Sequence, residues 1–111
     1  MQVSEASGRV VAADIETAFN SVDLAILDVA RLTTTVMEAK SDTVIAPARF
    51  QGVVDSMSAS LAKIVEGRKA MVSAHRRLSS FKGQSNLAEV NFGCFSITEE
   101  SELSKDVNAI A

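Results

Sequence analysis

Few residues of this chain carry side chains typical of catalytic or metal sites, and they show no recognisable spacing. The sequence contains one histidine, His75, and one cysteine, Cys94. A single cysteine cannot form a disulfide within the chain, and one histidine with one cysteine is fewer than the usual ligand set of a zinc site. Cys94 is expected to be a small, partly buried apolar residue. Because the acidic residues also form no catalytic pattern, we predict no enzymatic activity, no cofactor and no metal site.

His75 could accept a phosphoryl group, and the residues after it resemble a known motif. The run from Lys82 to Ser85 (Lys-Gly-Gln-Ser) resembles the Lys-Gly-x-Ser motif of histidine phosphotransfer domains, which present a histidine from a four-helix bundle. In that family the lysine follows the histidine by one helical turn, whereas Lys82 follows His75 by seven residues. The resemblance implies phosphotransfer through His75 as an alternative function. The simpler interpretation is a histidine at the edge of a helix–helix contact.

Five basic residues and no acid, from Arg68 to Lys82, suggest a second alternative, which is RNA binding by a hairpin dimer. On a helical wheel Lys69 and Arg76 align, and Arg77 lies about 80° away. No aromatic residues interleave with these cations to stack on bases. The formal net charge of −3 also provides no general attraction to nucleic acid. We therefore expect Lys69, Arg76 and Arg77 to form a solvated face.

Two long helices must position these residues. Residues 10–40 contain no Gly and no Pro. A set of residues that are all apolar except Thr33 recurs in alternating steps of four and three, at Ile15, Phe19, Val22, Ile26, Val29, Thr33 and Val36. This spacing predicts a helix whose inward stripe, the set of residues facing a partner helix, is typical of a coiled coil or helix bundle.

A second helix is expected over residues 47–82, because Pro47 suits the first helical position and Gly83 suits a helix end. The inward stripe expected for it consists of Phe50, Val54, Met57, Leu61, Ile64, Met71 and Leu78, with Ala74 and Phe81 completing it from the other side. A linker of roughly six residues forces the two helices to be antiparallel. The first helix carries five acids and two bases, and the second carries two acids and seven bases.

The expected fold is therefore all-α: a long antiparallel helical hairpin over residues 10–82, after an N-terminal extension of residues 1–9. The tail, residues 83–111, is expected to contain an extended segment and a short helix at about residues 98–109. Leu24 and Leu27 lie away from the inward stripe, so either Phe92, Phe95 and Leu103 of the tail or a second copy of the chain should cover them. We predict a homodimer that forms a four-helix bundle.

These features predict a non-enzymatic helical protein–protein interaction module, such as an adaptor, chaperone or regulator, that acts as a homo-oligomer. Its interaction residues would be Leu24, Leu27, Phe92 and Phe95, and its partners would be itself and an unidentified protein. Nucleic acid and membranes are not expected partners. No run of about 18 apolar residues occurs and no secretory signal is visible, and the single cysteine fits a reducing compartment, so the expected location is the cytoplasm.

Overall fold

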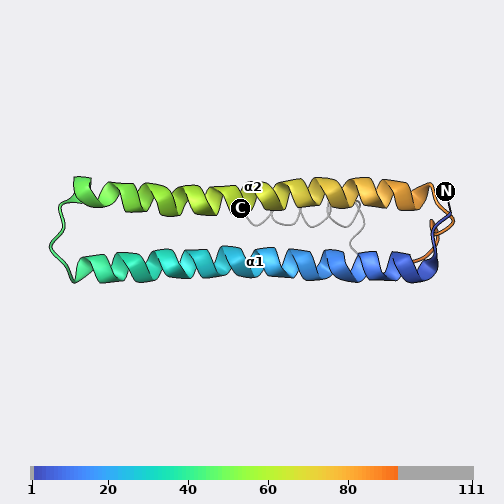
Figure 1. The fold of residues 1–111 in the computed structure, drawn as a ribbon, viewed down its shortest axis with the longest axis horizontal. Coiled ribbons are helices and arrows are strands. Elements are labelled where there is room, and N and C mark those ends of the chain that lie inside the picture. The colour runs from blue at the N-terminus through green and yellow to red at the C-terminus, as the bar shows by residue number, and fades with distance from the viewer. Residues whose placement is uncertain (1, 93–111) are drawn as a thin grey trace, which may run out of the picture. The chain divides into compact units, whose positions relative to one another are not determined.

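The computed structural model describes residues 2–92, and these residues form two helices, α1 (Glu5–Ser41) and α2 (Pro47–Gly83), without a strand (Figure 1). The prediction of an all-α helical hairpin is confirmed. Phe95 and the short helix expected at residues 98–109 lie outside the described residues. The contacts divide the described chain into two units: residues 2–17 with 72–92, and residues 18–71.

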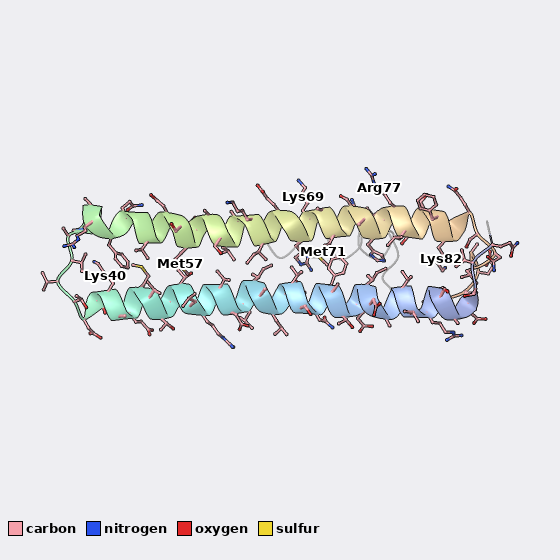
Figure 2. All side chains as sticks on the ribbon, in the orientation of Figure 1. Lys40, Met57, Lys69, Met71, Arg77 and Lys82 are labelled. Carbon is pink, nitrogen blue, oxygen red and sulfur yellow. The ribbon has the colours of Figure 1, made fainter. Side chains whose placement is uncertain are left out.

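In the unit of residues 18–71, the inward stripes of α1 and α2 lie against each other. All the predicted stripe residues of α1 in this unit are half-buried, as are Phe50, Met57, Leu61, Ile64 and Met71 of α2, and Val54 is exposed. Figure 2 shows Met57 and Met71 pointing toward α1 and Lys69 pointing away from it. No side chain of this unit is fully buried, because two helices cover only one stripe of each other.

The sequence around Ser4 explains why α1 begins earlier than expected. The Ser4 hydroxyl oxygen accepts a hydrogen bond of 3.0 Å from the backbone N–H of Ser7, which is the geometry of a helix N-cap. Glu5 places a negative charge in the first turn, where the helix dipole favours it. Residues 5–9, expected as part of an extension, are therefore helical. α2 begins at Pro47 as predicted and ends at Gly83.

In the unit of residues 2–17 and 72–92, the second half of α2 turns a different face inward from the one its apolar residues indicate. The prediction that Ala74, Leu78 and Phe81 lie on the inward stripe is wrong, since all three are exposed, Leu78 by 45% and Phe81 by 57%. Buried or half-buried positions fall instead at His75, Ser79 and Lys82. These positions continue the steps of three and four residues set by the first half of α2, so the geometry of the helix pair prevails over hydrophobicity here.

Candidate interaction surface

Leu24 and Leu27 lie on the side of α1 that faces away from α2, as the helical wheel predicts. They are 58% and 44% exposed. Within the same unit, Leu32 of α1 and Val53 and Val65 of α2 are also exposed, by 42% or more. Large aliphatic side chains therefore reach solvent on both helices.

Arg68 occupies an inward position of α2 that the apolar pattern did not identify. Its Nε donates a hydrogen bond of 2.6 Å to Oδ1 of Asp23, and its guanidinium lies 5.5 Å from the centre of the Phe19 ring. The two charged side chains remain 41% and 52% exposed, so the ion pair stays largely hydrated. This contact links α1 to α2 and places Asp23 level with Arg68.

Phe92 packs against the start of α1 of its own chain. A Cβ atom built on Gly8 would lie 2.8 Å from Cζ of Phe92 and 2.9 Å from Cδ1 of Leu87, so any larger residue at this position would require these side chains to shift. Leu87 is only 6% exposed. The ammonium of Lys82 lies 5.8 Å from the centre of the Phe92 ring and donates to the carbonyl oxygen of Ala88 at 3.3 Å.

Asn86 ties the same segment to the residues before α1. Its Oδ1 accepts a hydrogen bond of 2.7 Å from the backbone N–H of Val3, and its Nδ2 donates one of 2.9 Å to the carbonyl oxygen of Val3. We call the contacts of Val3 and Gly8 with Asn86, Leu87 and Phe92 the clasp. Sequence reasoning missed the clasp, although a glycine within a capped helical segment is a signal of close packing.

His75 is 8% exposed and lies at an inward position of α2. The imidazole of a phosphotransfer domain must be reached by a phosphoryl donor, and this burial leaves little surface for that reaction. Lys82, the lysine of the Lys-Gly-x-Ser resemblance, interacts with Ala88 and the Phe92 ring. Lys82 and Ser85 of the motif therefore lie beside the clasp, since Ser85 also accepts a hydrogen bond from the backbone N–H of Leu87.

The three cations of the RNA-binding alternative, Lys69, Arg76 and Arg77, are all exposed. Figure 2 shows Lys69 and Arg77 pointing away from α1. Their exposure agrees with a solvated face and does not by itself indicate a nucleic-acid site.

A shallow hollow beside the clasp is lined by Arg9, Ala13, Glu16, Asn91 and Phe92. Across residues 2–92, no three His, Cys, Asp or Glu side chains gather in a way that could hold a metal ion. Neither described helix combines the length and the apolar character needed to cross a membrane.

The chain matches no protein-family model, no curated protein and no solved structure.

Proposed function

We propose that this protein is a non-enzymatic helical interaction module, an adaptor, chaperone or regulator, that acts as a homo-oligomer. The observation that carries the proposal is the thin interior of the hairpin. Ala12 and Leu87 are the only hydrophobic residues of the described chain that are buried, whereas Leu24, Leu27 and Leu32 of a single helix are each at least 44% exposed.

The energetics of such a hairpin favour association. Fully burying a Leu or Val side chain gives roughly 1.5–3 kcal/mol relative to leaving it exposed, and part of this gain is unrealised at each exposed leucine. Two helices alone rarely bury enough apolar surface to offset the entropy of ordering them. A second hairpin would cover a further stripe of each helix and complete a four-helix bundle.

Leu24 and Leu27 supply the surface for a different protein. They point away from α2, so a bundle formed through the sides of the hairpin leaves them accessible. Neighbouring exposed leucines on one helix are a common anchor for an amphipathic partner helix. In this proposal the module works in the cytoplasm, where its single cysteine stays reduced.

The mass in solution tests the proposal. Light scattering on the full chain eluting from a size-exclusion column, across a wide range of concentrations, should give about twice the chain mass of 11.8 kDa. A mass of one chain at every concentration would refute the homo-oligomer. Loss of the dimer on dilution, with a measurable Kd, would agree with the proposal.

A further inference from the structure

One side of the hairpin in the unit of residues 18–71 carries no charged residue. The residues of this side repeat every seven positions on each helix, and each directly precedes a residue that faces, or nearly faces, the other helix. They are Ala18, Ala25, Leu32 and Ala39 on α1, and Val53, Ser60 and Gly67 on α2. Equivalent positions of two antiparallel helices fall on the same side of the pair, because a twofold axis perpendicular to the plane of the helices relates them. We call this set the apolar flank.

The other side of the same unit is less suited to being covered. It also holds large apolar residues, Met37 and Val65, which are 43% and 50% exposed. However, Asp23 lies on it, paired with Arg68 across the two helices. Covering that side would remove water from both charged groups, whereas the apolar flank itself contains no charged residue.

The sizes of the side chains on the apolar flank alternate in a way that suits a second hairpin. Arg68 contacts both Asp23 and Phe19, which lie one turn apart on α1, and so aligns the two helices to within about one turn. Stepping along both helices from the Asp23–Arg68 pair places Leu32 about level with Ser60, and Ala25 about level with Gly67. A Cβ atom on Gly67 would meet nothing within 4 Å, so no part of the same chain packs against this glycine. The space beside it is open to a helix of another chain.

Charges at the edge of the apolar flank indicate which helix that would be. Asp28 of α1 and Lys63 of α2 border the flank, are exposed and form no ion pair within the described chain. Stepping five residues from Asp23 and from Arg68 places them within about one turn of the same level. Packing α1 against α2 of a second copy brings Asp28 opposite Lys63 of that copy, twice by symmetry. Packing α1 against α1 would place no Lys63 opposite Asp28.

We propose that a second copy of this chain docks on the apolar flank, with α1 against α2 of that copy and Asp28 opposite its Lys63. This inference rests on the proposed homo-oligomer and adds its interface. The level pairs then combine a large with a small residue, Leu32 with Ser60, or two small ones, Ala25 with Gly67. Such pairs let two helices approach closely without leaving a cavity.

Two matched substitutions on α1 test the choice of side. Leu32→Glu places a charge on the apolar flank, and Met37→Glu places the same charge on the opposite side at a similar exposure. Concentration-dependent sedimentation of the full chain should show the dimer Kd rising at least a hundredfold for Leu32→Glu and less than about threefold for Met37→Glu. The reverse order, or equal effects, would overturn the choice of the apolar flank.

A charge-swap cycle tests the pairing of helices and uses exposed residues whose substitution leaves the hairpin folded. Asp28→Lys alone and Lys63→Asp alone should each weaken the dimer about tenfold, because two symmetric pairs become repulsive. The double variant should return the Kd to within about threefold of the native value. If Asp28→Lys tightens the dimer, or the double variant is weaker than either single variant, α1 does not face α2 of the second copy.

These outcomes separate the interface from the function. A native chain that is monomeric refutes the homo-oligomer itself. A native dimer that resists Leu32→Glu and fails the charge-swap cycle refutes only the interface. If Leu32→Glu loses its helical circular dichroism signal, the charge-swap cycle decides the question alone.

Discussion

Two glycines of the helices should respond in opposite directions to the same substitution. Gly8 of α1 and Gly52 of α2 both lie inside helices, where alanine is more favourable than glycine by up to about 1 kcal/mol. A methyl group on Gly52 would meet nothing within 4 Å, whereas one on Gly8 would come within 2.9 Å of both Leu87 and Phe92. Gly52→Ala should therefore stabilise the protein, and Gly8→Ala should not.

The contact distances set the size of the difference. For Gly8→Ala, Cδ1 of Leu87 and Cζ of Phe92 must each move by several tenths of an ångström to reach an ordinary separation. Overpacking of this kind typically costs about 1–3 kcal/mol, and Leu87, which is 6% exposed, loses part of its burial. After the gain in helix propensity, Gly8→Ala should lower the free energy of unfolding by about 1 kcal/mol. Gly52→Ala should raise it by about 0.5–1 kcal/mol.

Urea unfolding measures both variants against the native chain. The circular dichroism signal at about 222 nm follows the helices, and linear extrapolation gives the free energy of unfolding at one fixed protein concentration. The prediction concerns the difference between the two alanine variants, about 2 kcal/mol, so that a general effect of alanine cancels. If Gly8→Ala stabilises the protein as much as Gly52→Ala, the clasp does not pack on Gly8 as described.

Two further substitutions probe the remaining contacts. Asn86→Ala removes both hydrogen bonds to Val3, so hydrogen exchange of the Val3 amide should accelerate by up to about tenfold. Asn86→Asp keeps the acceptor for the Val3 N–H and should therefore show a smaller change. Equal exchange rates in the native chain and both variants would contradict the contact. Arg68→Met replaces the partly hydrated ion pair with Asp23 by an apolar side chain at an inward position. The free energy of unfolding, measured in urea, should therefore stay the same or rise by up to about 1 kcal/mol. A loss above about 2 kcal/mol would show that the ion pair contributes more than its exposure implies.

The apolar spacing was sufficient to predict both helices, because a single stripe of α1 meets a single stripe of α2, and the short linker predicted their antiparallel pairing. The spacing failed in the second half of α2, where Leu78 and Phe81 are exposed and His75 and Lys82 face inward. Hydrophobicity indicates which residues would gain free energy from burial. The side of α2 that faces α1 is instead fixed by the spacing of three and four residues between inward positions, which is set in the first half of the helix. Lys82 tolerates its inward position because its long stem lets the ammonium reach the carbonyl oxygen of Ala88.

The exposure of Leu24 and Leu27 could be predicted from the helical wheel, but the position of Phe92 could not. Phe92 follows an irregular segment, and its packing depends on the space left by Gly8, which is distant in sequence. The local pattern does contain the cap formed by Ser4, and it would have placed the start of α1 correctly. Nothing local indicates that Asn86 binds the backbone of Val3.

The clasp also sets an order of folding. The farther a contact lies from the loop, the greater is the sequence separation of the residues that it joins. Asp23 and Arg68 are separated by 45 positions, and Val3 and Asn86 by 83. Loop closure costs more entropy for longer loops, so pairing of the helices should begin near residues 42–46 and advance one layer at a time. The clasp then closes last and reopens first. Separation of Val3 from Asn86 is therefore the first step of opening from this end, and it must also expose Leu87, which is only 6% exposed in the closed state.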